Sequence, residues 1–387
     1  MLEVNYAGMK LKNPVIVSSA TPSINANCIK KAANAGAGAV VTKSVVFPDK
    51  NGKPAGSYPR PRFMLMNTSS GYDPDIAEKG GFFSLFRAGE PYPTPDEMTA
   101  MLKEVKNSDC VDCPIIVSIC GPAGDYDLWI KLAKLMENAG ADALELNMHC
   151  ERPRIKTADP LIVKAVKDNV KIPVIPKLMA INDNPEVIGP QMELAGADAI
   201  AGLGTFGFNG LEIDIKNKSP YFGTFFGLGG SWLRPVSLAY MARISEKTSL
   251  PLSGVTGVQT WEDAVKYILI GATTVQICGV IYARGYKVIG EIADGLEKYM
   301  SDNGYKSIED FRGKALKNIK ASEYAPPVKA KVLEDKCIGC RKCQDICLFD
   351  AISIGDNKKV VIDSSKCDGC GVCWSLCPSK AIEMSRI

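Results

Sequence analysis

Two hydrophobic patterns alternate along the first 300 residues: short apolar runs rich in β-branched residues, and longer segments with apolar residues at every third or fourth position. Continuous apolar runs are typical of parallel strands covered on both faces, and the second pattern is that of amphipathic helices. The predicted strands span 14–18, 39–43, 114–119, 143–148, 173–178, 199–203, 252–256 and 274–278, and the clearest helices span 126–138, 185–194, 235–246 and 261–270. Eight such units in succession predict an α/β fold, the (β/α)8 TIM barrel.

A short repeat precedes every second predicted strand. Its four copies are Ala35-Gly36-Ala37, Ala139-Gly140-Ala141, Ala195-Gly196-Ala197 and Ile270-Gly271-Ala272. We expect each glycine to end a helix in the left-handed conformation, and the small residue after it to let the strand enter the crowded barrel floor. The regular spacing favours a closed barrel over an open doubly wound sheet.

One connection is much longer than the others. Residues 45–92 follow the second predicted strand and are rich in Gly, Pro, Tyr and Phe. Long loops in compact domains are commonly binding loops or lids, and this one leaves the C-terminal end of a barrel strand, where the sites of such barrels lie. We predict a lid over the barrel mouth, with a surface excursion as the alternative.

Two runs of cysteines near the C-terminus share the spacing C-x2-C-x2-C-x3-C. This duplicated spacing is that of bacterial ferredoxins with two [4Fe-4S] clusters, in which the fourth cysteine of each run binds the other cluster. Disulfides would imply a secreted protein, and zinc needs only four ligands per ion. The predicted ligands are Cys337, Cys340, Cys343 and Cys377 for cluster 1, and Cys367, Cys370, Cys373 and Cys347 for cluster 2.

The length of 387 residues exceeds that of a ferredoxin alone. We predict a barrel over 1–315, a linker over 316–330 that contains Pro326-Pro327, and a small α+β ferredoxin domain over 331–387. The sequence has no basic run with interleaved aromatic residues and no stretch of about 18 apolar residues, so we expect neither a nucleic-acid partner nor a membrane span. The 14 cysteines indicate a reducing compartment, and we expect a cytoplasmic protein of an anaerobe.

Polar residues and glycines follow the predicted strands, at the end where barrel enzymes build their sites. A buried, unpaired lysine is unfavourable, so Lys43 and Lys177 predict a charged or electron-rich partner, such as a flavin ring or ribityl oxygen. Glycines at 229–230, 257 and 279 would form a phosphate-binding corner, unless they merely end strands. The predicted cofactor-binding residues are Ser19, Ala20, Lys43, Ser44, Asn147, Lys177, Gly204, Thr205, Gly230, Thr256, Gly257, Cys278 and Gly279.

The whole chain resembles the flavin barrel and C-terminal iron–sulfur region of dihydropyrimidine dehydrogenase, including its two-subunit bacterial form, and the barrel is also similar to dihydroorotate dehydrogenase. The motifs behind this resemblance are Asn13-Pro14, Ser19-Ala20-Thr21-Pro22, Thr42-Lys43-Ser44, the A-L-E-L-N-x-x-C run ending at Cys150, Pro176-Lys177-Leu178, Leu233-Arg234-Pro235 and Val275-Gln276-Ile277. The resemblance implies a bound FMN and an oxidoreductase acting on a CH–CH or C=C bond. It implies FMN contacts for Ser19, Lys43, Lys177, Thr205, Gly230, Gly257 and Gly279.

The resemblance further implies that Cys150 exchanges a proton with the substrate. Reducing a polarised C=C bond adds hydride to one carbon and a proton to its neighbour, and a thiol, with an ordinary pKa of about 8.5, can supply that proton. A small buried core residue is the alternative for a free cysteine. His149, the only histidine, could orient the substrate or share the proton transfer. Arg152 and Arg154 could meet a carboxylate or be solvated at the surface.

Three departures from the pyrimidine enzymes concern the substrate. The residues after the cysteine are Glu151-Arg152-Pro153-Arg154 in place of an immediate proline, Gly204 stands where an Asn is expected, and no lid Asn is evident near residues 82–86. Of the amides that would read a pyrimidine ring, Asn147 alone clearly remains. The leading hypothesis is an ene-reductase or dehydrogenase for a flat conjugated molecule. The alternative is an electron-transfer subunit whose barrel no longer turns over a substrate.

No G-x-G-x-x-G motif follows a predicted strand and opens a helix, so the sequence predicts no nicotinamide site. Electrons would therefore pass between FMN and the clusters, because clusters carry single electrons and FMN converts them into hydride. The expected electron partner is an NAD(P)H-oxidising flavoprotein subunit or a ferredoxin, and the expected assembly is a homo-oligomer or hetero-oligomer.

Overall fold

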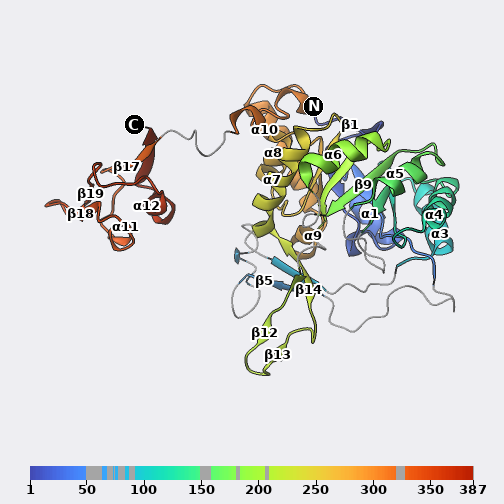
Figure 1. Cartoon of the computed structure of the whole chain (residues 1–387), viewed down its shortest axis with the longest axis horizontal. Coiled ribbons are helices and arrows are strands. Elements are labelled where there is room, and N and C mark those ends of the chain that lie inside the picture. The colour runs from blue at the N-terminus through green and yellow to red at the C-terminus, as the bar shows by residue number, and fades with distance from the viewer. Residues whose placement is uncertain are drawn as a thin grey trace. The chain divides into compact units, whose positions relative to one another are not determined.

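The computed structural model describes residues 1–48, 63–67, 73, 75–76, 83–86, 92–148, 158–179, 184–204, 209–319 and 327–386. Contacts divide the chain into two compact units, Met1–Lys317 and Asn318–Ile387. Both are drawn in Figure 1, and each is described by itself below. None of the described helices is both long enough and apolar enough to cross a membrane.

Eight parallel strands close a barrel in the first unit, and they follow one another around it in chain order. They are β3 (Val15–Val17), β4 (Ala39–Val41), β7 (Ile115–Ile119), β8 (Ala143–Asn147), β9 (Val174–Met179), β10 (Ile200–Gly204), β15 (Leu252–Val255) and β16 (Thr274–Ile277), and β16 pairs with β3. Most of their side chains are buried whichever way they point, because one face lines the interior and the other lies under helices. The predicted (β/α)8 barrel is confirmed, with strand ends within two residues of those expected.

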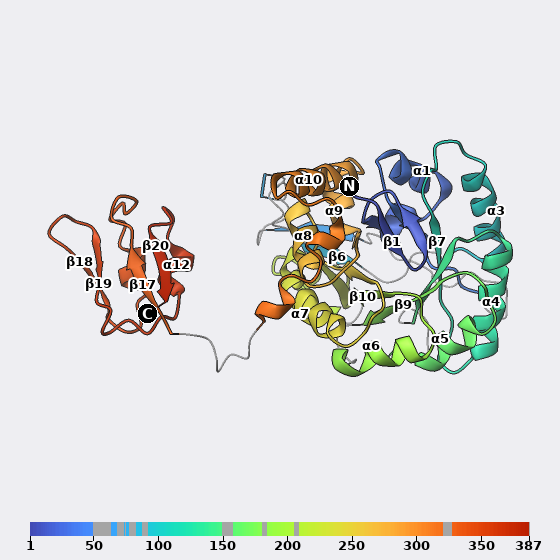
Figure 2. The ribbon, with the colours of Figure 1, turned by 90° about the horizontal axis from the view of Figure 1, so that it is seen from above.

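Helices surround the barrel as a ring (Figure 2). They are α1 (Ala26–Asn34), α3 (Pro95–Lys106), α4 (Tyr126–Asn138), α5 (Pro160–Lys167), α6 (Pro185–Leu194), α7 (Arg234–Ser245), α8 (Trp261–Leu269), α9 (Gly279–Arg284) and α10 (Val288–Asp302), with 3-10 turns η1 (Thr21–Ser23), η3 (Ser231–Leu233), η4 (Ile308–Asp310) and η5 (Leu316–Asn318). Their apolar faces join the strands in one continuous core. The repeated glycines 36, 140, 196 and 271 have φ between 89° and 102°, as predicted for helix ends.

The two ends of the barrel carry different additions (Figure 1). The hairpin β1 (Val4–Tyr6) and β2 (Met9–Leu11) leads into β3, so it lies at the N-terminal end of the strands, where Tyr6 and Leu11 are fully buried. The opposite end carries an antiparallel sheet in the order β11 (Asn209–Gly210), β14 (Phe226–Gly230), β6 (Phe83–Phe86) and β5 (Phe63–Met66).

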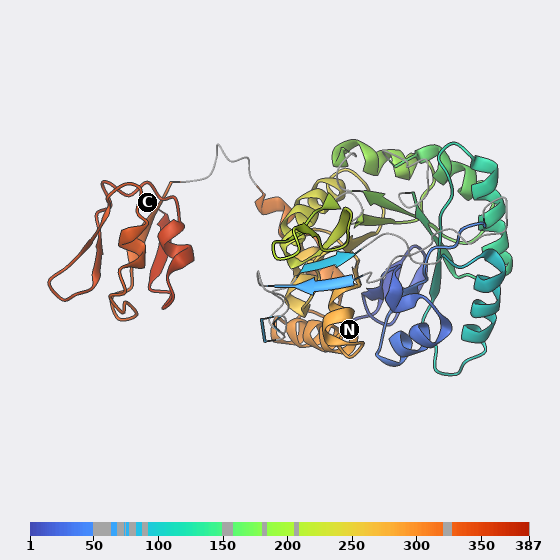
Figure 3. The same ribbon diagram turned by 90° about the horizontal axis from the view of Figure 1, so that it is seen from below.

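This antiparallel sheet shows that part of the long 45–92 connection is regular structure. Strands β5 and β6 (light blue in Figure 3) pair with each other. Strand β6 also pairs with β14, which belongs to a second excursion from the barrel, the connection between β10 and η3. The ring of Phe63 lies 4.8 Å from that of Tyr282 on α9, which attaches the sheet to the barrel. The second excursion also forms the hairpin β12 (Ile213–Asp214) and β13 (Ser219–Pro220). The remaining residues of the expected lid, at 49–62 and much of 68–91, lie outside the described residues.

The second unit has two strand pairs and two short helices. Strand β17 (Val328–Val332) pairs with β20 (Ile382–Arg386), and β18 (Ile352–Ile354) pairs with β19 (Val360–Ile362). Helices α11 (Lys342–Asp345) and α12 (Val372–Leu376) each start within one of the two cysteine runs. Strand β17 begins three residues before the expected start of this domain, and residues 320–326 of the expected linker lie outside the described residues.

Candidate active site at the barrel mouth

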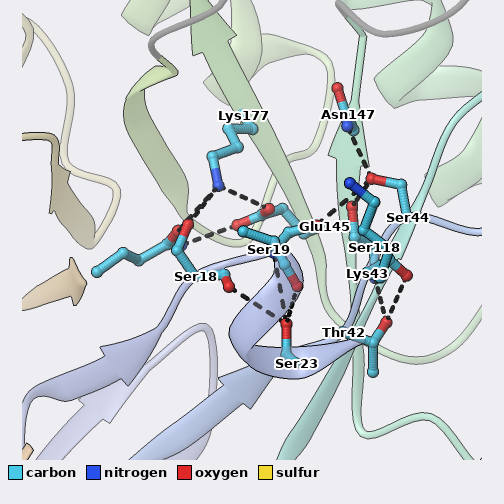
Figure 4. A network of polar contacts seen from close by, with 12 residues as sticks. Ser18, Ser19, Ser23, Thr42, Lys43, Ser44, Ser118, Glu145, Asn147 and Lys177 are labelled. Carbon is cyan, nitrogen blue, oxygen red and sulfur yellow. Dashed lines mark hydrogen bonds and ion pairs between the residues drawn. The ribbon is translucent and has the colours of Figure 1, made fainter. Parts of the chain in front are cut away.

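Polar side chains converge at the C-terminal ends of β3, β4, β7 and β8 (Figure 4). The hydroxyl of Ser44 is at the centre of this group, the serine cluster, which consists of Ser19, Ser44, Ser118 and Asn147. Asn147 Nδ2 donates to Ser44 Oγ at 2.7 Å, and the hydroxyls of Ser118 and Ser19 lie 2.9 Å and 3.4 Å from the same oxygen. Ser44, Ser118 and Asn147 are buried, and Ser19 is partly exposed. The cluster therefore fixes the Asn147 amide at the mouth of the barrel.

A second group, the lysine cluster, consists of Ser18, Glu145, Lys177 and Gln276. Lys177 Nζ lies 3.0 Å from Glu145 Oε1, from Ser18 Oγ and from Gln276 Oε1. Figure 4 labels Lys177, Glu145 and Ser18. Gln276 Nε2 donates to Glu145 Oε2 at 2.8 Å. Side-chain exposure is 7% for Lys177 and 1% for Glu145, so this is a buried ion pair.

Lys177 and Lys43 each have a partner of the expected kind within the protein, a charged one and an electron-rich one. Lys177 is paired with Glu145, and Lys43 is partly exposed with its Nζ 4.9 Å from the centre of the Tyr92 ring, a cation–π contact. The pairing of Lys177 is the reason why it can be buried at all, since an isolated charge in an apolar interior is unfavourable. A bound group is therefore not needed to explain either lysine.

Glu145 and Gln276 were missed as site residues, although the sequence carried a signal for both. Side chains two positions apart on a strand point to the same side, so Glu145 shares the inward face of β8 with Asn147. A charged residue facing the interior of a small barrel requires a partner of opposite charge. Lys177, on the neighbouring strand β9, was the available partner, and Gln276 on β16 completes the hydrogen bonds.

The glycine-rich corner is assembled from four separate segments. Thr256 and Gly257, after β15, have φ of 83° and 78°, and positive φ is rare for a β-branched residue such as Thr. Tyr267 supports this turn by donating from its hydroxyl to the carbonyls of Val255 and Thr256, at 3.0 and 2.6 Å. Burial raises the pKa of Tyr267, so its hydroxyl stays protonated and remains a donor. The backbone turn is thus held in a strained conformation.

Gly257 packs directly against the start of α7, where a Cβ atom would lie 2.7 Å from Cβ of Arg234. Gly230 immediately precedes η3 and α7 at φ 131°. The backbone of Gly229 pairs with Ser84 of β6, and a Cβ atom on Gly279 would lie 3.7 Å from the Ser84 hydroxyl. The predicted glycine positions are therefore brought together at one corner of the mouth.

The other predicted residues fall into two groups. Ala20 precedes η1, Gly204 ends β10 and Cys278 precedes α9, so each lies at the C-terminal end of a barrel strand. Outside the described residues lie Cys150 and His149, the two predicted catalytic residues, together with Thr205, Arg152 and Arg154.

The cysteines of the second unit are arranged around its small core. A pocket is lined by Cys347 of the first run together with Cys367, Cys370 and Cys373 of the second. Cys343 is buried in the same core, and Cys337 and Cys377 pack against it. Burial raises the pKa of the Cys343 and Cys373 thiols. Across the part of the chain that the structure describes, no three His, Cys, Asp or Glu side chains are placed to hold a single metal ion.

Sequence comparison adds to this geometry. Residues 1–300 match the dihydroorotate dehydrogenase family, and residues 330–384 match a 4Fe-4S dicluster domain. The chain belongs to the dihydroorotate dehydrogenase family. The predicted family, the ferredoxin-like domain and the class of enzyme, an oxidoreductase acting on CH–CH donors, are thereby confirmed.

Relatives from this family differ in how much of the chain they match. The catalytic subunit of dihydroorotate dehydrogenase B (NAD(+)) of Pyrococcus abyssi is 35% identical over 332 residues, covering 82% of this chain and 100% of the relative. The corresponding subunit of Methanocaldococcus jannaschii is 31% identical over 329 residues, with 81% and 98% covered. The NAD-dependent dihydropyrimidine dehydrogenase subunit PreA of Escherichia coli (strain K12) is 28% identical over 368 residues, with 89% and 85% covered.

Membership of the family implies FMN in the barrel and iron–sulfur chemistry in the C-terminal unit. The residues at the mouth fit a flavin nucleotide: hydroxyls, one amide and two lysines lie at the strand ends, and the corner offers the backbone of Gly257 and Gly279, which carry no side chains of their own. The cysteine-lined pocket in turn offers the thiolate donors that an iron–sulfur cluster uses. The cytoplasmic location, the anaerobic source and the oligomeric state stay predictions.

Proposed function

We propose that this chain is an FMN- and iron–sulfur-dependent oxidoreductase that acts on the CH–CH or C=C bond of a flat, conjugated ring of the dihydropyrimidine type. The observation that carries the proposal is the combination of two features on one chain. Asn147, Lys43 and Lys177 lie at the ends of three barrel strands at the mouth, and the following unit matches a 4Fe-4S dicluster domain. The barrel mouth suits two-electron chemistry on a small molecule, and the 4Fe-4S unit suits the transfer of single electrons.

FMN would be held by residues from several strand ends. Ser19, Ala20, Ser44, Gly204, Thr205 and Cys278 would line its ring and ribityl chain, Lys43 and Lys177 would face its electron-rich edge, and Gly230, Thr256, Gly257 and Gly279 would receive its phosphate. When bound, FMN supplies hydride exchange with a carbon of the substrate and single-electron exchange with the clusters. The strained turn at Thr256 supports this assignment, because such backbone strain is concentrated at functional sites.

The chain's own residues would handle binding and the proton. Asn147, held by the Ser44 hydroxyl, would hydrogen-bond the polar edge of the substrate ring. Cys150, three residues beyond Asn147, would transfer a proton between its Sγ atom and the carbon next to the hydride position. His149 would orient the substrate beside this thiol. The sheet of β5, β6 and β14 would restrict water at the mouth, since Phe63 of β5 contacts Tyr282 on α9, the helix that begins at Gly279.

The extent of the similarity supports a dihydropyrimidine-type substrate. The dihydroorotate dehydrogenase B relatives align along nearly their whole length, and the alignments cover 82% and 81% of this chain. The dihydropyrimidine dehydrogenase subunit covers 89%, a span that necessarily reaches into the segment of the 4Fe-4S domain. Arg152 and Arg154 would add affinity for a carboxylate, so a ring that carries an acidic group belongs in any substrate panel.

The clusters would connect the barrel to an external electron source. Cys337, Cys340, Cys343 and Cys377 would hold one cluster, and Cys367, Cys370, Cys373 and Cys347 the other. The cysteine-lined pocket supports the second set, because Cys347 lines it together with the three cysteines of the other run. The electron partner would be an NAD(P)H-oxidising flavoprotein subunit or a ferredoxin, in line with a relative that is itself named as a subunit.

One observation favours a second function, that of an electron-carrying subunit without turnover in the barrel. Gly204 ends β10 without a side chain, where an amide would otherwise read the substrate ring. Loss of that reader leaves polar groups of a pyrimidine unpaired, which strongly disfavours its binding.

Single-turnover oxidation separates the two functions. The protein is purified without oxygen, its iron and flavin are quantified, the flavin is reduced with dithionite, and uracil, thymine, orotate and cyclic enones are added in turn. The proposed function predicts bound FMN and rapid return of the flavin absorbance with at least one pyrimidine. Bound FMN that no compound of the panel reoxidises would favour the electron carrier, and absence of FMN would contradict both.

A further inference from the structure

The lysine cluster is an extensive buried polar group, and it joins segments from distant parts of the sequence. Ser18 directly follows β3, whereas Glu145 comes from β8, Lys177 from β9 and Gln276 from β16. Counted over the whole residue, all four are at most 6% exposed. Burying two charges and an amide in a barrel that could be filled with apolar side chains is unfavourable unless every group is satisfied.

Hydrogen bonds to Ser18, Glu145 and Gln276 hold the ammonium of Lys177 in place. An ammonium has three hydrogens, and its three acceptors each lie at 3.0 Å. Lys177 pairs in register with Asn147 at the mouth, whereas Glu145 pairs with Ile175, which lies deeper in the barrel. The carboxylate is thus placed beneath the lysine, and Gln276 binds both partners through its amide nitrogen and oxygen.

We propose that Glu145, oriented by Gln276, is a positioning residue that fixes the Lys177 ammonium at the mouth and offsets its charge, and that this pair sets how strongly the site favours the reduced flavin. The inference rests on the proposed function, because it requires FMN in the barrel. A reduced flavin carries more negative charge than an oxidised one, so a buried cation beside it favours reduction. The Glu145 carboxylate opposes that effect at short range, and burial leaves the opposition poorly screened.

The charge of each partner makes the two substitutions act in opposite directions. Glu145→Gln keeps the shape but removes the negative charge, so at a fixed potential the ratio of reduced to oxidised flavin should rise about tenfold, equivalent to about 30 mV for a two-electron couple. Lys177→Met should lower the same ratio by a similar factor. Glu145→Asp retains the charge and should stay within about threefold of the parent, which a purely structural role of the carboxyl group would not predict.

Asp198→Asn is the matched control. Asp198 forms an ion pair with Lys167 at 2.6 Å and accepts a hydrogen bond from the Val174 backbone, but it lies before β10, at the N-terminal end of the barrel. Its loss removes a lysine–carboxylate pair from the same unit without touching the mouth. We expect the flavin ratio of Asp198→Asn to equal that of the parent.

The experiment is a redox titration of the full-length protein, made with its flavin, against a dye of known potential, followed in the visible absorbance of the flavin. A ratio for Glu145→Gln that equals the parent's or falls below it overturns the inference. Should Glu145→Gln fail to fold, Gln276→Met tests the same claim, because it releases both partners: a shift of at least threefold is expected, and an unchanged ratio overturns it. A parent without flavin contradicts the proposed function, whereas a flavin-bound parent with unresponsive variants contradicts this inference alone.

Discussion

The barrel unit and the C-terminal unit are stabilised in different ways. In the barrel, apolar residues from eight strands and the surrounding helices form one continuous core, and several buried polar residues lie at the mouth. In the second unit the core is small, and three of its eight buried members are the cysteines 343, 367 and 373. A unit of 318–387 buries little apolar surface for its length. The comparison teaches that the chemistry of the barrel is added to a stable fold, whereas the chemistry of the second unit is part of its core.

Removal of iron breaks the comparison most severely. Because three of the proposed cluster ligands are core residues, chelation of iron under oxidising conditions should unfold the second unit, since structural metal sites contribute on the order of 10 kcal/mol to the folding of small domains. Limited proteolysis of the full chain should then cut throughout 328–386 while 1–317 resists digestion. Equal protection of both units after iron loss would contradict the difference in their cores.

Loss of one cysteine sharpens the comparison within the second unit. Cys347 lines a pocket with three cysteines of the other run, so Cys347→Ala should damage the cluster held by Cys367, Cys370 and Cys373. Iron content should fall by about half, and electron paramagnetic resonance of the reduced protein should lose one of two interacting signals. Cys110→Ala is the control, a thiol in the barrel unit that contacts the Ser108 hydroxyl. Loss of the other cluster instead would overturn the crossed ligand sets.

At the glycine corner, Gly257→Ala tests whether the mouth of the barrel is a built site. The new Cβ would lie 2.7 Å from Arg234 at a φ of 78°, and we expect a loss of stability of about 1–3 kcal/mol together with weaker FMN binding. Gly304→Ala is the matched control, with a φ of 70° and no atom within 4 Å of the new Cβ. Thermal unfolding and flavin content of the two variants are compared. Equal flavin content in both would show that the corner does not hold the phosphate.

Substitution of Lys43 is expected to have the smallest effect. Lys43→Ala removes a cation over the Tyr92 ring and should weaken FMN binding about tenfold, because the proposed function has this charge face the electron-rich edge of the flavin. Lys131→Ala removes a similar contact, in which Nζ lies 5.2 Å from the centre of the Phe47 ring. Both variants should lose about 0.5–1 kcal/mol of stability. Equilibrium dialysis of flavin should then separate them, and equal affinities would exclude Lys43 from the flavin site.

The fold was largely predictable because its strongest signals are local. Continuous apolar runs predicted the eight strands of the barrel, and the spacing of the cysteines predicted the second unit. The antiparallel sheet was not predictable in this way, since Phe83 pairs with Gly230, far along the chain.

The site was predictable in part for the same reason. Residues at strand ends could be named from the barrel alone, since all parallel strands end at one mouth. The pairing of Lys177 with Glu145 and Gln276 required knowing which residues share a layer inside the barrel, and sequence separations of 32 and 99 residues hide that relation. The inward charge of Glu145 was the available signal.

The most direct test of the account compares two variants in single-turnover experiments on each half of the reaction. Cys150→Ala should accept electrons from the clusters at the parent rate but pass them to substrate about 10²–10⁴-fold more slowly, because the proton donor is lost. Cys370→Ala should show the inverse pattern, with flavin that dithionite reduces directly, normal oxidation by substrate and impaired electron delivery. If Cys150→Ala oxidises at the parent rate while His149→Ala stalls, the proton donor is His149. If both Cys150→Ala and Cys370→Ala impair the same half-reaction, the division of roles between barrel and C-terminal unit is wrong.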